Sequence, residues 1–363
     1  MGGGRRLLCA LAGSLAALTA TATATAADPA PAVTAAAATQ SSSPSWAAPQ
    51  IASVVLAGVM GPSVVGFRPG DPLTREELHA AIVALGKQHR PPTDPTRIVT
   101  MRELDAQLVA AAGLLPAART IRLAARDAGL GPTDMLGTET VARLLGLRVN
   151  HPQGSEELER SPKQPASRAE AAYSLAKLRL LDASRIAAVR DTAATFLVSQ
   201  LGMWEQLVLA RAVRFVGYPY VFSGTSEKVQ KLWSSTAPGG TITVPGGFDC
   251  SGLVWRVFKT QPFDGAPLLP GVLRGRTTYA MSGEVGPALR VAPTAIRPGD
   301  VLFFGDRGPK SKPSEVGHSG IYVGNGWFVH SSSAGVTLQP LQGWYAERLA
   351  WARRPLAEAD LYV

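Results

Sequence analysis

The last third of the chain alternates short β-type runs with strong turn signals, and this pattern restricts the fold more than any other feature. Runs of β-branched and aromatic residues occur at 301–304, 319–323 and 327–330. Asn325-Gly326 separates the last two runs, and this dipeptide is a strong signal for a two-residue hairpin turn. The pattern therefore predicts an antiparallel sheet in which 319–323 and 327–330 are neighbouring strands.

A cysteine begins an apolar run upstream of this predicted sheet. Two glycines at 246–247 interrupt the chain, and apolar residues then follow Cys250 at helical spacing: Leu253, Val254, Val257 and Phe258. The spacing predicts that Cys250 lies at a helix N-terminus. There the free N–H groups and the helix dipole stabilise a thiolate and lower the pKa of the cysteine. The same N–H groups could hold an oxyanion.

Two histidines lie on the predicted hairpin downstream of this cysteine. His318 opens one strand and His330 ends its partner, so we expect the two imidazoles to be neighbours in space. A nucleophile on a helix start, a base on an adjacent strand and a third group on the next strand form a Cys–His–orienter triad. We therefore predict Cys250 as the nucleophile, His318 as the base and His330 as the residue that orients it.

Four ordered motifs in this part of the chain resemble the NlpC family of papain-like peptidoglycan endopeptidases. The resemblance covers about residues 203–352, and its motifs lie at 216–224, 248–252, 298–300 and 318–326. It implies an α+β domain with helices on an antiparallel sheet, which we place at 191–363. It also implies the same three roles for the cysteine and the two histidines.

The resemblance further implies residues that contact substrate. Tyr220 matches the family tyrosine that lines the pocket near the nucleophile, and Asp249 and Ser251 flank the cysteine where family members contact substrate. The usual substrate is the bond from γ-D-glutamate to diaminopimelate or lysine in the peptide stems of peptidoglycan. No cofactor is expected. No metal site is expected either, because the histidine spacing is not that of a zinc site.

The chain departs from the family pattern at two places. Ser223 stands where many relatives have a second glycine, and the stretch at 225–247 is longer than usual. This insertion is polar and carries Lys228 and Lys231, and we predict that it forms a flap beside the cleft. It leaves the identity of the cleaved bond open, but not the reaction class.

Other functions remain open on the sequence. One is cleavage of a different amide, such as the lactyl–alanine bond cut by related Cys–His wall amidases. Another is acyl transfer, in which a second amine replaces water. A third is a catalytically silent protein that binds the cell wall, although the intact cysteine and both histidines argue against it.

The N-terminus indicates export. Arg5 and Arg6 precede an apolar run at 7–18 and a stretch of small residues, the order of a secretory signal peptide, predicted at 1–27. The apolar run is too short for a membrane span. Removal of this peptide takes Cys9 away and leaves one cysteine, so an internal disulfide is excluded. Ala, Thr, Ser and Pro dominate 28–49, which we interpret as a disordered linker in a secreted or wall-associated protein.

Residues 50–190 are predicted to form an all-α region with a weak internal repeat. Thr or Ser, then Arg, then Glu opens an apolar helix near 74, 100 and 167, where the hydroxyl can cap the helix and the Glu favours its first turn. The first copy resembles an S-layer homology repeat, which implies binding to a cell-wall polymer. An ordinary helical region with capped helices explains the pattern equally well, so both interpretations stay open.

The charge pattern excludes one class of partner. The formal net charge is +9, and loss of Arg5 and Arg6 lowers it to +7. The basic residues are scattered, whereas a nucleic-acid groove usually shows clustered cations. We therefore expect no nucleic-acid partner. Diffuse positive charge suits contact with an anionic wall polymer.

Overall fold

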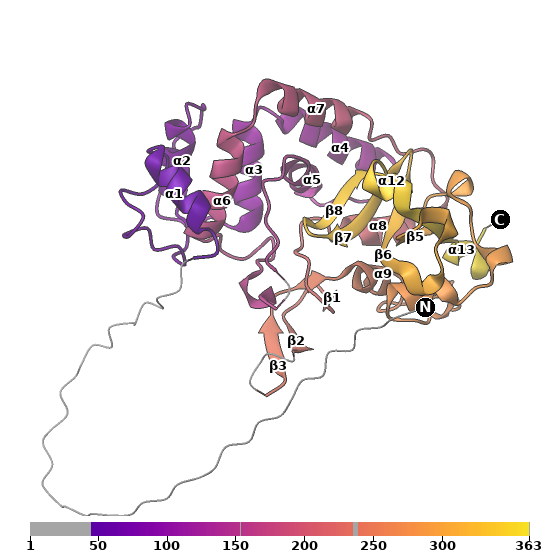
Figure 1. Cartoon of the computed structure of the whole chain (residues 1–363). Helices are drawn as coiled ribbons and strands as arrows, with labels where there is room; N and C mark the ends of the chain where they lie inside the picture. The colour runs from indigo at the N-terminus through magenta and orange to yellow at the C-terminus, as the bar shows by residue number, and fades with distance from the viewer. Residues whose placement is uncertain (1–44, 153, 235–238, 363) are drawn as a thin grey trace, which may run out of the picture. The chain divides into compact units, whose positions relative to one another are not determined.

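The computed structural model describes residues 45–152, 154–234 and 239–362 (Figure 1). The predicted signal peptide at 1–27 and most of the predicted linker lie outside these residues. The first helix begins at Ala48, so it includes the last two residues of the expected linker, and Ala47 beside its start is buried. Among the described residues, no helix has the length and apolar character needed to cross a membrane.

The N-terminal half of the described chain is helical, as the sequence predicts. Apolar residues of the helices face a shared core. The elements are α1 (Ala48–Leu56), α2 (Arg75–Ala84), α3 (Met101–Ala111), α4 (Leu115–Asp127), α5 (Leu136–Leu144), the 3-10 helix η1 (Glu156–Leu158), α6 (Arg168–Arg179) and α7 (Ala183–Ala194).

The three predicted repeats meet in a closed ring of backbone hydrogen bonds. The residues just before α2, α3 and α6 are bonded in turn: Leu73 N–H donates to Ala166 O at 2.8 Å, Ala166 N–H to Val99 O at 2.8 Å, and Val99 N–H to Leu73 O at 2.9 Å. The predicted helix caps form at Thr74 and Ser167. The hydroxyl of Thr100 caps nothing, so this prediction is wrong for the second repeat.

The C-terminal half contains the predicted α+β arrangement. Its elements before the main sheet are α8 (Met203–Val213), β1 (Thr225–Ser226), β2 (Gln230–Trp233), β3 (Thr241–Val244), β4 (Gly247–Phe248), α9 (Cys250–Phe258), α10 (Leu269–Val272), α11 (Thr278–Gly283), η2 (Pro287–Leu289) and η3 (Pro293–Ala295). The remaining elements are β5 (Val301–Gly305), η4 (Gly308–Lys310), η5 (Pro313–Glu315), β6 (Val316–Gly324), β7 (Trp327–Ser332), β8 (Gly335–Pro340), α12 (Trp344–Arg348), β9 (Leu349–Arg353) and α13 (Pro355–Glu358).

The main sheet is antiparallel throughout, with the strand order β8-β7-β6-β5-β9. The predicted hairpin is formed by β6 and β7, and both turn residues, Asn325 and Gly326, have the positive φ that a type I′ turn requires. Helices α8 and α9 pack against β6, and α9 also packs against β7 (Figure 1). The predicted core face of α9, formed by Leu253, Val254, Val257 and Phe258, is fully buried.

The helical half continues into the C-terminal half through direct packing. Helix α5 contacts β8, and one hydrophobic core contains residues of both halves. Residues 44–363 form one compact unit by their contacts. The boundary that the sequence places near residue 190 is therefore not a gap in the structure, and it stays a prediction.

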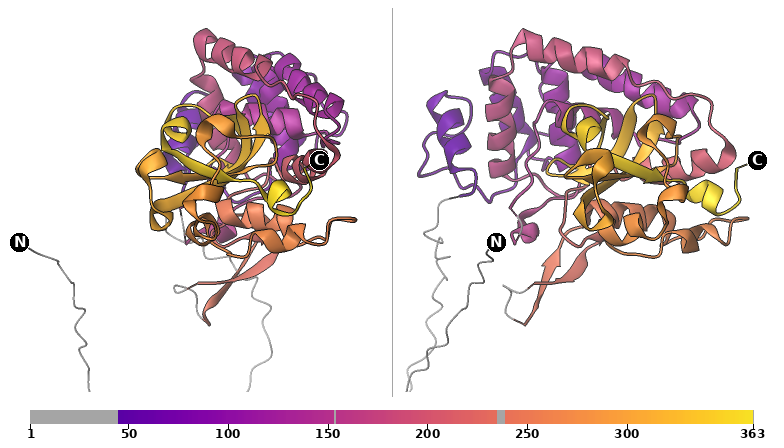
Figure 2. Two further views of the ribbon diagram at one scale, coloured as in Figure 1. Left: turned by 90° about the vertical axis from the view of Figure 1, so that its right-hand side faces the viewer. Right: turned by 45° about the vertical axis from the view of Figure 1, so that its right-hand side comes forward.

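The insertion at 225–247 forms two small antiparallel pairs. Strands β1 and β4 pair with each other, and β2 and β3 form a hairpin in which Trp233 lies opposite Thr241. This hairpin projects away from the main sheet in all views (Figures 1 and 2). Gln230 and Val244 at its base are buried, whereas Trp233 is 77% exposed. The described part of the predicted flap thus contains a two-stranded hairpin.

Candidate active site

Cys250 is the first residue of α9, as the sequence predicts. Asp249 precedes it as the N-cap and accepts a hydrogen bond from the backbone N–H of Gly252. The helix start lies directly against the chain at Gly224, because a Cβ atom at position 252 would come within 1.9 Å of Gly224 O. Glycine is therefore required two residues after the cysteine. Cys250 itself is partly exposed and unpaired.

The two predicted histidines are in direct contact. His318 Nε2 and His330 Nδ1 are 2.9 Å apart, and the two rings are perpendicular. His330 is fully buried and stacks on Phe328 with ring centroids 4.4 Å apart. The buried ring can therefore fix the orientation of His318, whose Nδ1 atom remains for another partner. His318 is the third residue of β6, two positions later in the strand than expected.

The cysteine lies against the strand that carries His318. The N–H groups of Ser319 and Ser251 reach the Cys250 sulfur, and Ser319 directly follows His318 in β6. Burial raises the pKa of Cys250 to about 11, the charge of Asp249 adds to this effect, and the two N–H groups offset part of it. Burial also lowers the pKa of His318 to about 4.

The expected lowering of the cysteine pKa by the helix N-terminus is therefore wrong for the ligand-free site. Removal of the thiolate from water raises the pKa by more than the helix start and the two N–H groups lower it. Burial acts on the imidazole in the opposite sense, and it also holds the pKa of His330 well below its ordinary value. Burial therefore favours the uncharged thiol and the neutral imidazoles over an ion pair in the ligand-free site.

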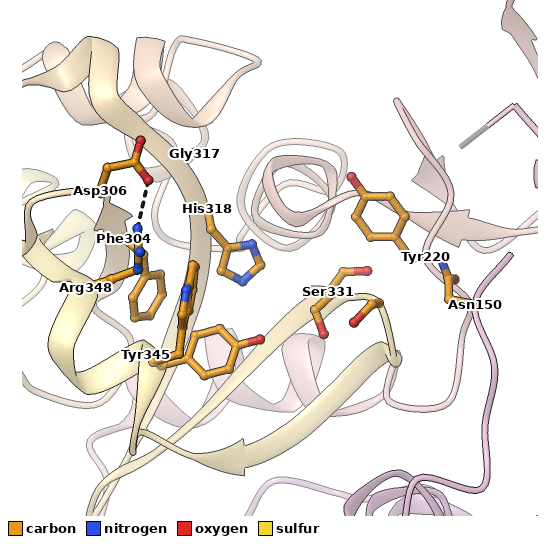
Figure 3. Close-up of a pocket in the computed structure, with 13 residues that line it drawn as sticks. Asn150, Tyr220, Phe304, Asp306, Gly317, His318, Ser331, Tyr345 and Arg348 are labelled. Atoms are coloured by element: carbon orange, nitrogen blue, oxygen red, sulfur yellow. Dashed lines mark hydrogen bonds and ion pairs between the residues drawn. The ribbon is translucent and has the colours of Figure 1, made fainter. Parts of the chain in front are cut away.

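A pocket of about 470 Å³ opens beside His318 (Figure 3). His318 and Tyr220 both line it, with Ser331 between them, and Tyr345 forms another part of the wall. Asn150, from the loop after α5, lies beside Tyr220. The complete lining is Asn150, Tyr220, Phe304, Gly305, Asp306, Gly317, His318, Ser331, Ser332, Ser333, Trp344, Tyr345 and Arg348. The helical half thus contributes to the same pocket as the main sheet.

Tyr220 lies close to the cysteine as well as in the pocket wall. Burial raises the pKa of the Tyr220 hydroxyl, and the charges of Cys250 and Asp249 add to this effect. Tyr220 forms a parallel bridge with Phe248, two residues before the cysteine. The structure therefore brings together the predicted nucleophile, both histidines and the predicted pocket tyrosine.

Comparisons with known proteins agree with this geometry. The profile of the NlpC/P60 family matches residues 217–354. Residues 217–354 form an NlpC/P60 domain. A protein of Mycobacterium tuberculosis named as a probable endopeptidase is 32% identical over 132 residues, which are 36% of this chain and 24% of that protein. The γ-DL-glutamyl hydrolase of Bacillus subtilis is 31% identical over 169 residues, which are 43% of this chain and 33% of that protein.

A solved structure gives a further similarity. The peptidoglycan hydrolase RipB of Mycobacterium tuberculosis is 27% identical, with a TM-score of 0.29, and the match covers 42% of this chain and 64% of that one. The chain spans between about a quarter and a third of the length of the two curated relatives named above.

Asp249 and Ser251, which flank Cys250, share an arginine partner in the structure. Both are buried, and both bind Arg276 in the loop before α11: Arg276 Nη2 donates to Asp249 Oδ2 at 2.9 Å, and Arg276 Nη1 to Ser251 Oγ at 2.7 Å. Neither residue lines the pocket. Their role as substrate contacts stays a prediction, while the structure gives them a part in fixing the start of α9 in the NlpC/P60 domain.

Arg276 is a residue that the sequence analysis missed. Its guanidinium also donates to Ser223 O at 3.1 Å, so it joins the segment before the insertion to the cysteine helix. Ser223 stands where the family pattern noted above often has glycine, and its φ of +62° is a left-handed conformation that glycine adopts without strain. The sequence signal for Arg276 is weak, because one arginine after Gly275 resembles any surface loop.

The pocket contains other residues without an earlier prediction. Asn150, Trp344 and Tyr345 lie in its wall, although they come from segments far apart in the sequence. None of the described residues of the insertion lines the pocket, so the predicted flap is not part of its wall. Within the described ranges, no group of three or more His, Cys, Asp or Glu side chains could hold a metal ion.

Proposed function

We propose that this protein is a secreted cysteine peptidase that hydrolyses amide bonds in the peptide stems of peptidoglycan. The bond from γ-D-glutamate to diaminopimelate or lysine is the proposed target. The observation that carries the proposal is the set of Cys250 at a helix start, His318 on the neighbouring strand and His330 bonded to His318 at 2.9 Å. Similarity to a γ-DL-glutamyl hydrolase supports the choice of bond.

The proposed reaction begins from a neutral pair. Cys250 transfers its proton to His318 as the sulfur attacks the amide carbon, which avoids a buried thiolate before substrate is bound. Backbone N–H groups at the start of α9 stabilise the oxyanion. His318 then protonates the leaving amine. Finally, His318 accepts a proton from water as the water oxygen attacks the thioester carbon, and it returns that proton to the departing sulfur, which releases the acid and regenerates the Cys250 thiol.

The low pKa of His318 suits the second proton transfer. Burial lowers this pKa to about 4, so the imidazolium formed during attack is a strong acid. It therefore gives its proton readily to the departing amine. In this scheme the Nδ1 atom of His330 holds the His318 ring through its Nε2 atom, and Tyr220 forms the substrate-facing wall.

Binding of a cell-wall polymer by the helical half is a second proposed function. The closed ring of three backbone hydrogen bonds favours it, because the three repeats form one structural unit rather than unrelated helix starts. The scattered positive charge is compatible with an anionic polymer. Sedimentation with purified cell walls, before and after removal of their anionic polymers, tests this function separately from catalysis.

The decisive test is cleavage of purified muropeptides. The chain from residue 28 is incubated with diaminopimelate-type and lysine-type stems, and the products are identified by mass spectrometry. We expect a new diaminopimelate or lysine N-terminus, and a loss of several orders of magnitude for Cys250→Ala. Cys250→Ser is the closest control in shape.

Other outcomes separate the alternatives. A product cut at the lactyl–alanine bond would make the protein an amidase, and a product joined to an added amine would make it an acyltransferase. If the folded protein bound peptidoglycan but cut none of the stems, the peptidase proposal would be wrong and the wall-binding role would remain.

A further inference from the structure

A buried ion pair from the helical half reaches the first residue of the NlpC/P60 domain. Glu139 and Arg143 lie one turn apart on α5, each with a side chain 1% exposed, and Arg143 Nη1 is 2.5 Å from Glu139 Oε2. The other terminal nitrogen of Arg143 donates to Gly217 O at 2.8 Å. We propose that Arg143, held by Glu139, is a positioning residue for the catalytic centre. This inference rests on the proposed peptidase function.

Both backbone polar groups of Gly217 form hydrogen bonds. Its carbonyl accepts from Arg143, and its N–H donates to Val336 O at 3.0 Å. Its φ of +109° is a conformation that other residues rarely adopt, and a Cβ atom there would lie 3.0 Å from Glu139 Cδ. The Glu139 side chain therefore packs closely against the backbone of residue 217, while Arg143 binds the carbonyl of the same residue.

The residues that follow Gly217 are also held by backbone contacts, and they lead to the pocket. Val336 N–H donates to Tyr218 O at 2.8 Å, and a Cβ atom at Gly335 would lie 2.5 Å from the same oxygen. Two residues later, Tyr220 lines the pocket. Movement at Gly217 would therefore displace Tyr220, because only two residues separate them.

The same segment also positions the cysteine. Phe248 N–H donates to Pro219 O at 3.2 Å, and Val221 N–H donates to Phe248 O at 3.2 Å. Ser331 Oγ donates to that carbonyl as well, at 2.6 Å, from the strand that carries His330. Phe248 is two residues before Cys250. A continuous set of contacts thus runs from Arg143 through 217–221 to the nucleophile.

The ion pair is costly in stability, which favours a positioning role. Among the described residues, Arg143 Nε and Glu139 Oε1 have no hydrogen-bond partner although both are buried. Such unpaired groups cost free energy, and a buried ion pair often stabilises a protein no better than apolar residues of similar size. The benefit that remains is the fixed orientation of the Arg143 donor toward Gly217 O.

The chain offers a matched control for Arg143. Arg168 is also a largely buried arginine of the helical half, pairs with Glu77, and donates from Nε to Phe67 O at 2.8 Å. Its contacts lie within the helical half and do not include 217–221. Loss of Arg168 should lower stability without affecting the catalytic centre.

The test compares Arg143→Met, Arg143→Lys and Arg168→Met in the otherwise unchanged protein. We expect Arg143→Met to lower kcat/KM on peptide stems roughly 10- to 100-fold, mainly through kcat, because small displacements of reacting groups have effects of this size. Arg143→Lys should recover part of the loss by donating to Gly217 O. Arg168→Met should remain within about threefold of the parent, and equal effects of both Met variants would overturn the proposal.

Amide hydrogen exchange gives a reading that does not depend on activity. Exchange in 218–224 should become faster in Arg143→Met and stay unchanged in Arg168→Met. Equal protection of this segment in both variants would overturn the inference. This outcome would hold whether or not the protein is a peptidase. If Arg143→Met fails to fold, Glu139→Gln replaces it, because this change keeps the size and removes the charge. Absence of cleavage by the parent would contradict the proposed function alone.

Discussion

Burial disfavours the charged forms of both Cys250 and His318 in the ligand-free site. The pKa of Cys250 is raised to about 11 and that of His318 is lowered to about 4. Since the thiolate is the reactive species, a raised pKa lowers the reactivity of the free thiol. The peptidase proposal then requires the proton to move from Cys250 to His318 during attack on the substrate.

The first prediction concerns the reactivity of this thiol. Because its pKa lies near 11, the thiolate fraction and the rate of alkylation by iodoacetamide should rise about tenfold for each pH unit between 7 and 10. The rate is measured by mass spectrometry on the folded protein, with Cys250→Ala as the blank. A plateau reached below pH 8 would instead indicate a thiolate–imidazolium pair.

The second prediction concerns His330. His330→Ala should lower kcat by roughly 10²- to 10⁴-fold, because His318 loses the partner that holds its ring. His330→Asn should retain more activity, since the side-chain oxygen of asparagine can lie near the position of Nδ1. Equal activity of both variants in a stem-cleavage assay would show that His330 does not orient His318.

The third prediction concerns the strained residue Ser223. A left-handed conformation costs a residue with a side chain about 1–2 kcal/mol, and the greater freedom of unfolded glycine offsets about 0.5–1 kcal/mol of the relief. Ser223→Gly should therefore stabilise the protein by about 0.5–1 kcal/mol in urea unfolding. Destabilisation would show that the serine side chain makes a contact that outweighs the strain.

At the scale of elements, local patterns predicted the parts of the site that depend on short stretches of chain. The turn at Asn325-Gly326 and the apolar spacing after Cys250 determine the hairpin and the helix start, and the structure contains both. Arg276 and Asn150 were missed because long-range packing brings them to the site. The cysteine pKa was predicted in the wrong direction because its burial depends on elements far along the chain.

The fourth prediction belongs to α5. Burial raises the pKa of Glu139 to about 7 from an ordinary 4.5, Asp105 adds to the shift, and Arg143 and Arg148 offset part of it. The carboxyl group therefore contributes stability below about pH 4.5 that is lost as the pH rises through 7.

The comparison with Glu139→Gln isolates this effect, because glutamine does not titrate. Relative to that variant, the parent protein should lose on the order of 3 kcal/mol of unfolding free energy between pH 4.5 and pH 8. Urea unfolding at several pH values measures the difference. A difference that is constant with pH would mean that Glu139 has an ordinary pKa.

At the scale of the whole molecule, the helical half and the NlpC/P60 domain share one core. Helix α5 packs on β8, its Arg143 binds Gly217, and Asn150 completes the pocket wall. These contacts were not predictable from the composition of the chain, which led us to place a domain boundary near residue 190. The change in composition marks a change of secondary structure and does not interrupt the packing.

The fifth prediction follows from this shared core. The chain from residue 44 should unfold in one cooperative transition, because separation of the two halves would expose α5 and β8 together. Tryptophan fluorescence reports mainly on the C-terminal half and far-UV circular dichroism mainly on the helices. Their urea transitions should coincide, and two resolved midpoints would contradict the prediction.

The ring formed by Leu73, Val99 and Ala166 limits how the helical half can change in evolution. Each residue donates its N–H to one of the other two, and its carbonyl oxygen accepts from the third. Every N–H and every carbonyl of the three residues therefore has a partner within the ring. An open stack of repeats can lengthen or shorten by whole units at its ends. A closed ring has no end, and loss of one member would leave a donor and an acceptor unmatched. Closure therefore opposes the gain or loss of a single repeat, and we expect length changes to be tolerated best in the loops between the helices.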